Sequence, residues 1–252
     1  MNTRPAWRTE CEPLREKRRV SENAHPFSPA SENPFAADAF EARLRALATR
    51  PLFEFPDGEI PSDFRRSSVL LCFWRDAAEI RVLLTKRAAT LRGNPGQMAF
   101  PGGRLEEGEG WVEAALRETE EEVGLDRGHV EVLGRLDDAW SGSRYQLVPI
   151  VGWIGSLPEL TLNPGEVASV HTPTISQLLG PSVFSREAAD LDGDVFYNDT
   201  LRWGDEHVFG LSTDLLIEAI RWGLGQDLEP SASHGASRLA SLRSWLRMKA
   251  RA

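Results

Sequence analysis

Three glutamates, Glu118, Glu121 and Glu122, lie within five positions of a helix predicted over residues 111–123. Side chains three or four positions apart are neighbours on a helix surface, so the three carboxylates are expected to share one patch. Each like-charged pair destabilises the helix by about 0.2–0.5 kcal/mol, and the negative end of the helix dipole adds to the repulsion. A divalent cation such as Mg²⁺, which binds carboxylate oxygens and keeps water for a phosphate ligand, would offset this repulsion. Taken alone, however, a glutamate-rich helix face is more often simply solvated.

The residues around the three glutamates favour the metal site. Arg117 and Glu109 carry opposite charges and can tie the preceding loop to the helix. Gly102 and Gly103 let the backbone approach a ligand closely, as only glycine permits. The helix is predicted to end at Gly124. Its buried stripe is predicted to consist of Val112, Ala115, Leu116, Thr119 and Val123.

The stretch from residue 103 to residue 125 resembles the Nudix box. The pattern is Gly, five residues, Glu, seven residues, Arg-Glu, an aliphatic residue, any residue, Glu-Glu, any residue, Gly and an aliphatic residue. It is matched by Gly103, Glu109, Arg117, Glu118, Glu121, Glu122, Gly124 and Leu125. Thr119 replaces the usual aliphatic residue, and because Thr is nearly isosteric with Val we expect intact chemistry.

The resemblance implies an α/β fold, a Nudix-type α/β/α sandwich with a mixed β-sheet, and hydrolysis of a diphosphate that links a nucleoside to another group. It implies Mg²⁺ or Mn²⁺ as cofactor, with Glu118 and Glu122 as the first-choice ligands. Glu121 would be a shared ligand or a base, and the carbonyl of Gly103 would complete the metal site. Arg117 is placed with the catalytic residues, where it would orient carboxylates rather than touch substrate.

A second, narrower resemblance precedes the box. Residues 83–103 resemble the block that marks the coenzyme A diphosphatase branch of the Nudix hydrolases, with Ala88 in place of a common Ser and Asn94 where many members have His. Three segments downstream, at residues 148–154, 163–167 and 208–213, also resemble that branch. The matching residues of the block are Leu84, Thr85, Arg87, Leu91, Arg92, Gly96, Gln97, Phe100 and Pro101.

This second resemblance implies a small-molecule nucleotide substrate, coenzyme A, and the products 3′,5′-ADP and 4′-phosphopantetheine. Arg87 and Arg92 are the candidate phosphate-binding residues, since a guanidinium suits phosphate oxygens, although lone arginines are more often surface ion-pair partners. Glu166, after Pro164 and Gly165, is a candidate general base, against the alternative of a solvated glutamate. Two other functions stay open: hydrolysis of ADP-ribose, NADH or another dinucleotide, and a non-catalytic nucleotide-binding regulator. The intact box disfavours the regulator, because a pure binder needs no three-carboxylate cluster.

The elements that must position these residues follow from apolar patterning and turn residues. Residues 67–74 and 79–85 are predicted as a strand hairpin, and residues 91–103, rich in Gly and Pro, as mostly loop. Further strands are predicted at 130–136 and 146–154, and further helices at 36–48, 174–179 and 211–222.

The distribution of charge along the chain limits the classes of molecule that the protein can bind. The 252 residues carry a net charge of -9, yet residues 1–20 hold six Lys or Arg against three acids, and residues 231–252 hold five and no acid. An acidic body between basic ends argues against nucleic-acid binding through the folded domain.

No apolar stretch is long enough for a transmembrane segment. Two isolated cysteines, Cys11 and Cys72, make no disulfide framework, which favours a cytoplasmic location and a buried core role for Cys72. A homodimer is left open.

Three regions are predicted. Residues 1–35 are expected to form a disordered leader, residues 36–228 the Nudix hydrolase domain, and residues 229–252 a basic C-terminal tail. For the tail, an amphipathic helix with Leu239, Leu242 and Leu246 on one side and a disordered segment are both open. Residues 1–34 and 231–252 are expected to be dispensable for chemistry.

Overall fold

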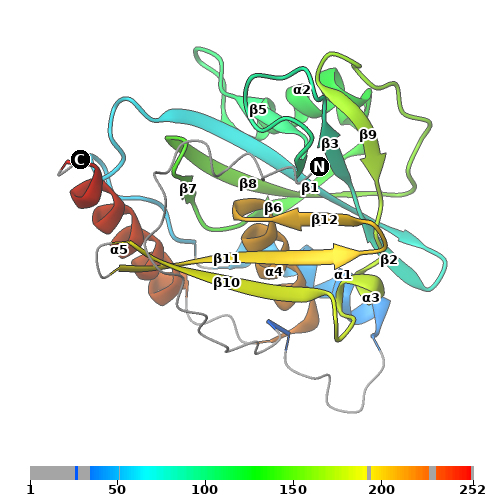
Figure 1. Cartoon of the computed structure of the whole chain (residues 1–252). Helices are drawn as coiled ribbons and strands as arrows, with labels where there is room; N and C mark the ends of the chain where they lie inside the picture. The colour runs from blue at the N-terminus through cyan, green and yellow to red at the C-terminus, as the bar shows by residue number, and fades with distance from the viewer. Residues whose placement is uncertain (1–25, 28–34, 51, 192–193, 227–230, 251–252) are drawn as a thin grey trace, which may run out of the picture.

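A mixed β-sheet lies between helices in the computed structural model, which describes residues 26–27, 35–50, 52–191, 194–226 and 231–250 (Figure 1). The sheet is centred on β1 (Arg65–Asp76) and β8 (Tyr145–Ile154), which pair in parallel with Leu70 opposite Ile150. The other four strands pair antiparallel to these two, so the sheet is mixed as predicted. They are β2 (Glu79–Val82), β5 (Gly102–Arg104), β6 (Glu131–Arg135) and β7 (Ala139–Ser141).

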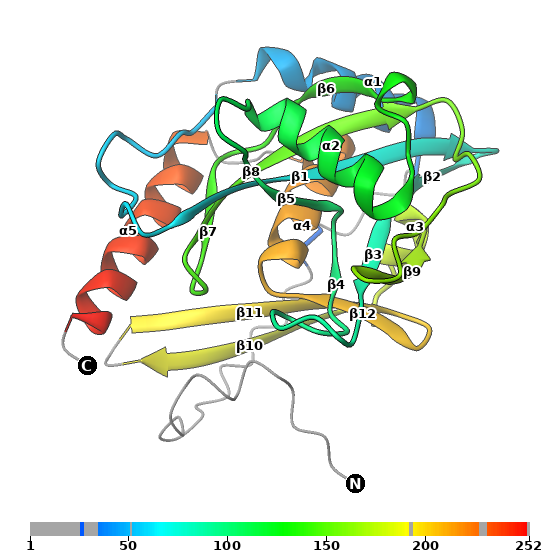
Figure 2. The ribbon, with the colours of Figure 1, turned by 90° about the horizontal axis from the view of Figure 1, so that it is seen from above.

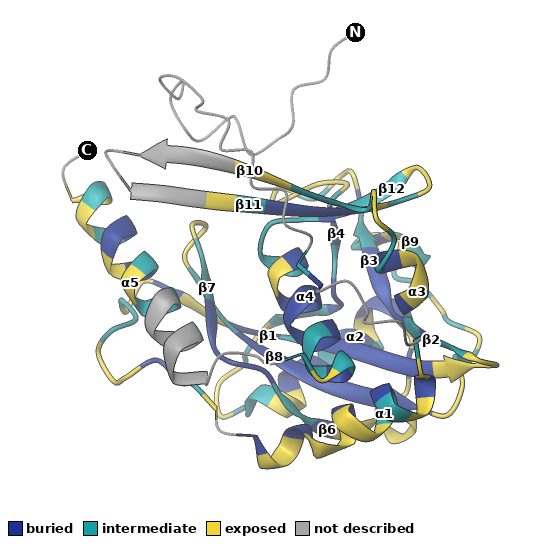
Figure 3. Ribbon diagram, turned by 90° about the horizontal axis from the view of Figure 1, so that it is seen from below, coloured by how far each residue is buried: buried dark blue, intermediate teal, exposed yellow. Residues whose placement is uncertain are grey.

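Alternation along β1 explains why both faces of the sheet are covered. Successive side chains of a strand point to opposite faces. Leu70 and Cys72 pack on one face with the apolar side of α2 (Trp111–Val123), whereas Leu71 and Phe73 pack on the other with α1 (Ala37–Arg45) and α4 (Leu211–Leu224). Figure 2 shows α2 in front of the sheet from above, and Figure 3 shows α4 in front of it from below. The predicted α/β/α sandwich is confirmed, and Cys72 is a buried core residue.

Two smaller sheets were not predicted. In the first, β3 (Leu84–Arg87) lies between β4 (Met98–Ala99) and β9 (Val167–His171). The predicted second hairpin strand is therefore split, and the expected loop over 91–103 contains β4 and β5. The second sheet consists of β10 (Phe184–Leu191), β11 (Asp194–Trp203) and β12 (Glu206–Phe209). The short helices are η2 (Ala46–Thr49), η3 (Arg127–His129) and α3 (Ile175–Leu178).

The C-terminal segment forms a helix, α5 (Ser231–Lys249), which lies beside the end of β7 (Figure 1). Leu242 and Trp245 of α5 are buried in an apolar cluster with Phe55 and Phe64. Of the two alternatives for this segment, the structure therefore has the helix, and that helix packs on the domain. Most of the predicted leader lies outside the described residues. None of the helices in the described part of the chain has the length and apolar character needed to cross a membrane.

Candidate active site

The catalytic candidates are carried by α2, whose bounds confirm the sequence prediction. The helix ends at Gly124, whose φ of 71° is left-handed, and a Cβ at this position would lie 2.9 Å from the backbone nitrogen of Thr161. The loop between β8 and β9 binds the free carbonyls of the helix end: Thr161 N donates to Val123 O at 3.0 Å and Asn163 N to Glu122 O at 2.9 Å. This loop is thereby held against the end of α2, and it carries Glu166 towards the helix glutamates.

The buried face of α2 differs from the predicted stripe. Val112 is exposed by 39%, whereas Glu122, which was predicted to lie on the outer side, is only 6% exposed. Two adjacent small residues, Ala114 and Ala115, are fully buried and let the helix lie close to the sheet. Glu122 faces β5, where its Oε2 accepts a hydrogen bond from Gly102 N at 3.2 Å. The three glutamates therefore do not share one open surface patch.

Glu118 lies over the other glycine of β5. A Cβ built on Gly103 would meet Glu118 Cδ at 2.3 Å and both carboxylate oxygens at 2.4 Å. The Glu118 side chain is only 18% exposed, and its Oε1 is 3.1 Å from Arg117 Nη1. Only glycine at position 103 leaves room for this carboxylate, which places the backbone of residue 103 and Glu118 at one site, as the sequence predicted.

Arg117 connects the loop, β5 and the helix. Its Nε and Nη2 donate to the two oxygens of Glu109 at 2.8 and 3.0 Å, and Nη2 also donates to Arg104 O at 2.9 Å. Nη1 reaches Glu118 and Glu121, each at 3.1 Å. The hydrogen bond from Arg117 lowers the pKa of Glu109 and raises that of the arginine. These contacts engage all five N–H donors of the guanidinium, so Arg117 positions carboxylates.

Three carboxylates from two segments repel one another at this site. Burial, helped by the charges of Glu166 and Glu118, raises the pKa of Glu122 to about 7, while the Gly102 N–H and the charge of Arg87 act against this shift. The pKa of Glu118 is also raised, mainly by burial, with Glu166 again contributing. Glu166 and Arg87 therefore act electrostatically on the Glu118–Glu122 pair, and their roles remain predictions.

Two other candidate residues, Glu121 and Arg92, are exposed to solvent. The Glu121 side chain is 55% exposed and bonded to Arg117, so it is the outermost of the three helix glutamates. Arg92 is exposed in the loop between β3 and β4. The N–H of Gly102 and the loop anchor Asn163 were not singled out from the sequence; the Pro-Gly-Gly and Asn-Pro-Gly motifs were the available signals.

The donor set fits a hard divalent cation. Across the ranges that the structure describes, no three Asp, Glu, His or Cys side chains are gathered closely enough to enclose a metal by themselves. Mg²⁺ does not need such a cage, because it is commonly held by one or two carboxylates together with waters and substrate phosphates. Glu118 and Glu122 supply two such carboxylates, and they carry repulsion that a cation would relieve.

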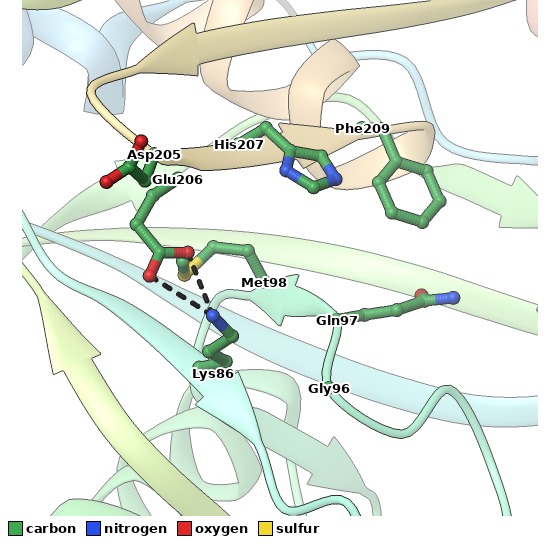
Figure 4. Close-up of a pocket in the computed structure, with 8 residues that line it drawn as sticks. All are labelled: Lys86, Gly96, Gln97, Met98, Asp205, Glu206, His207 and Phe209. Carbon is green, nitrogen blue, oxygen red and sulfur yellow. Dashed lines mark hydrogen bonds and ion pairs between the residues drawn. The ribbon is translucent and has the colours of Figure 1, made fainter. Parts of the chain in front are cut away.

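A recess of about 120 Å³ opens beside β3, between β4 and β12 (Figure 4). Lys86 Nζ bonds both oxygens of Glu206 on its wall, at 3.1 and 3.0 Å. Burial lowers the pKa of His207, so this ring is neutral at pH 7, and it stacks on Phe209 with ring centres 5.9 Å apart. Lys86, which lines the recess, and Arg87, a candidate phosphate-binding residue, are neighbours in β3.

A methyl group at position 103 is expected to displace the Glu118 carboxylate. Gly103→Ala should lower kcat by about tenfold to a hundredfold, because a misplaced ligand weakens transition-state stabilisation by about 1.4–2.8 kcal/mol. The melting temperature should change little, since the clash is with the mobile end of a side chain. Steady-state kinetics with a thermal melt test this, and unchanged kcat would show that Gly103 does not seat Glu118.

The raised pKa of Glu122 predicts a pH-dependent stability of the metal-free protein. The Glu122 carboxyl holds its proton up to about pH 7 in the folded state, whereas an ordinary glutamate loses it near 4.5. The free energy of unfolding should therefore fall as pH rises between these values. At pH 8, Glu122→Gln should be more stable than wild type by about 2–3 kcal/mol, and the difference should vanish at pH 4. Urea unfolding with a chelator measures this, and equal stabilities at pH 8 would contradict the assigned burial.

Comparisons with known proteins agree with this geometry. The NUDIX domain family matches residues 64–191, which include all of β1, β5 and α2. Nudix hydrolase 3 of Caenorhabditis elegans is 37% identical over 150 residues, covering 58% of this chain and 62% of that protein. The mitochondrial Nudix hydrolase 15 of Arabidopsis thaliana is 32% identical over 180 residues, covering 67% and 61%. The uncharacterized Nudix hydrolase NudL of Cronobacter sakazakii is 39% identical over 148 residues, covering 58% and 73%.

The matched segment spans less than two thirds of the first two relatives' own length. The family match nonetheless covers half of this chain and includes every residue of the acidic site. From the box residues, the sandwich that positions them and this match, we conclude that the chain belongs to the NUDIX domain family.

Proposed function

We propose that the protein hydrolyses the diphosphate bond of coenzyme A or its derivatives, yielding 3′,5′-ADP and 4′-phosphopantetheine with Mg²⁺ or Mn²⁺ as cofactor. The observation that supports this proposal is that one loop bonds both the block that resembles the coenzyme A branch and the box helix: Ala88 N donates to Glu166 O at 2.8 Å, and Asn163 N donates to Glu122 O at 2.9 Å. A cytoplasmic location is part of the proposal, and a homodimer remains an expectation.

The residues of the site have separable roles in this proposal. Glu118 and Glu122 would hold the metal, with the Gly103 carbonyl and waters. When bound, the ion supplies charge stabilisation to the phosphoryl oxygens and lowers the pKa of water. Glu166, on the loop that is hydrogen-bonded to the end of α2, would accept the proton of the attacking water. Arg117 holds Glu118 and Glu121 in place, and Arg87 would bind an oxygen of the diphosphate.

A substrate panel tests the proposal. Catalytic efficiency should be highest on coenzyme A among coenzyme A, dephospho-coenzyme A, ADP-ribose and NADH, each assayed with Mg²⁺ and with Mn²⁺. The products should be 3′,5′-ADP and phosphopantetheine by mass. A wide margin for ADP-ribose or NADH would contradict the coenzyme A assignment and leave a diphosphate hydrolase. Tight nucleotide binding without turnover of any member would favour a regulator.

A further inference from the structure

Two arginines and a tyrosine meet on the sheet face that is turned away from α2. Arg65 of β1 is opposite Tyr145 of β8 in the parallel ladder, and Arg104 of β5 is opposite Ser67 of β1. Since side chains two apart on a strand share a face, Arg65, Ser67 and their two partners lie on the same side. Their neighbours Ser68 and Gly103 pair on the other side, where Glu118 lies.

Both arginines are directed at one oxygen. Arg65 Nη1 donates to the Tyr145 hydroxyl at 3.1 Å, and the guanidinium carbon lies 5.5 Å from the centre of the ring. Arg104 is placed on the same face by its pairing with Ser67, two residues from Arg65, and its positive charge also acts on this hydroxyl. Partial burial would raise the pKa of Tyr145, but the interactions with Arg104 and Arg65 lower it overall. Two cations therefore converge on a neutral acceptor.

This convergence is unusual for the arginines of this chain. Most of the described arginines face an acid, as Arg144 faces Asp63 at 2.6 Å. For Arg65 and Arg104, the described residues provide no carboxylate at ion-pair distance. In a chain of net charge -9, this leaves uncompensated positive charge at the edge of the acidic site. Such a pair is suited to an anion.

The arginine pair is fixed to the strand that holds the acidic site. Arg104 directly follows Gly103, so their Cα atoms are about 3.8 Å apart. The carbonyl of Arg104 accepts a hydrogen bond from Arg117 Nη2 at 2.9 Å, which ties the residue to the Nudix helix. A substrate whose diphosphate lies at Glu118 and Glu122 can therefore present a second anionic group to Arg104 around the edge of β5.

We propose that Arg65, Arg104 and Tyr145 bind a phosphate monoester that the substrate carries in addition to its diphosphate. This assignment rests on the proposed function, in which that group is the phosphate on the ribose of coenzyme A. The two planar guanidiniums bind phosphate oxygens, which take over the hydrogen bond now accepted by the tyrosine, and the hydroxyl donates to the same phosphate. Arg87 is then left for the diphosphate.

Arg66 supplies a matched control. It neighbours Arg65 on β1 but belongs to the other side of the strand, with its guanidinium carbon 4.5 Å from the centre of the Trp111 ring. It has the same charge and is equally exposed. If positive charge alone attracts the anionic ligand, Arg66 variants should lose affinity as well. If Arg65 and Arg104 form a specific phosphate subsite, Arg66 variants should keep the wild-type affinity.

The experiment compares coenzyme A with dephospho-coenzyme A, which lacks only this phosphate. Calorimetric titration in a chelator, where no turnover occurs, should show that wild type binds coenzyme A at least about tenfold more tightly. Arg104→Gln and Arg65→Gln should each remove most of this preference by lowering the affinity for coenzyme A. The affinity for dephospho-coenzyme A should stay unchanged, which would show that the fold is intact. Arg66→Gln should keep the wild-type ratio. With Mg²⁺, Arg104→Gln should raise KM for coenzyme A and leave kcat nearly unchanged.

The outcomes separate this subsite from the proposed function. Equal affinity of wild type for the two ligands, or equal loss in Arg66→Gln and Arg104→Gln, would overturn the subsite even if the diphosphate is hydrolysed. A retained preference for the phosphorylated ligand without hydrolysis would instead overturn the proposed function and support the subsite.

Discussion

Glu122→Gln is expected to lower kcat by roughly a hundredfold to ten-thousandfold, because losing a metal ligand removes several kcal/mol of transition-state stabilisation. Glutamine keeps the shape of the side chain and an oxygen that can accept the hydrogen bond from Gly102 N, so the fold should persist. Glu118→Gln should have a similar effect, since its carboxylate lies over Gly103. Turnover at saturating Mg²⁺, with circular dichroism of each variant, measures this.

Glu120 provides the matched control on the same helix. It points away from β5 and pairs with Arg127 at 2.7 Å in an exposed ion pair. Glu120→Gln should therefore change kcat by no more than about twofold, since exposed ion pairs contribute little. Near-wild-type turnover of Glu122→Gln, or an equal loss in Glu120→Gln, would show that the metal assignment is wrong.

Arg238→Ala is expected to destabilise the domain by about 2–4 kcal/mol and to lower the melting temperature by about 5–15 °C. Arg238 of α5 bonds Glu218 Oε2 at 2.7 Å, and the Glu218 side chain is only 2% exposed. It also donates to the carbonyls of Asp137 and Asp138 at 2.9 and 3.1 Å. Its loss would remove the guanidinium from Glu218 Oε2 and from the two carbonyls, while Arg50 still pairs with Glu218 Oε1 at 2.9 Å.

Arg243 is the control for this prediction, because it lies on the same helix in a more exposed ion pair with Glu59. Arg243→Ala should change stability by less than about 0.5 kcal/mol. Removal of residues 231–252 should lower the melting temperature at least as much as Arg238→Ala. The folded part of such a sample should keep the wild-type kcat, because these residues are predicted to be dispensable for chemistry. Equal melting of wild type and Arg238→Ala would show that the buried ion pairs do not anchor α5.

The elements that sequence patterning located best are those with a strong local signal. The helix over 111–123 has a periodic apolar side and a terminal glycine, and both of its bounds agree with the structure. The strands β1 and β8 are long, apolar and buried on both faces, so their patterns also reached the correct residues within about two positions.

The elements that were missed depend on contacts distant in sequence. β4 has two residues, in a segment rich in Gly and Pro, and exists because it pairs with β3. Arg186 in β10 makes a two-pronged ion pair with Asp199 of β11 at 2.6 and 2.7 Å, a contact that apolar periodicity does not report. The helix α5 was one of two open alternatives for its segment, and its position is set by Trp245 and Arg238, which contact residues far upstream.

The candidate site was predicted in composition better than in arrangement. The box pattern named Glu118 and Glu122, which meet the two glycines of β5, whereas the role of Glu166, on the loop bonded to the end of α2, stays a prediction. The predicted stripe was right at Ala115, Thr119 and Val123, which are buried, and wrong at Val112, which is exposed. Glu122 was predicted to face outward and is buried. Helical periodicity alone cannot show that a glutamate finds a backbone N–H inside the protein, which is what stabilises Glu122 in place.

The central claim is that Glu118 and Glu122 hold a divalent metal ion at β5. The most direct measurement is titration of Mn²⁺ followed by electron paramagnetic resonance at pH 8, where Glu122 is ionised. Wild type should bind Mn²⁺ at one tight site and so remove the signal of free Mn²⁺. Glu122→Gln should lower the affinity of this site by about tenfold to a hundredfold, and Glu120→Gln should leave it unchanged. Identical Mn²⁺ binding by wild type and Glu122→Gln would contradict the account.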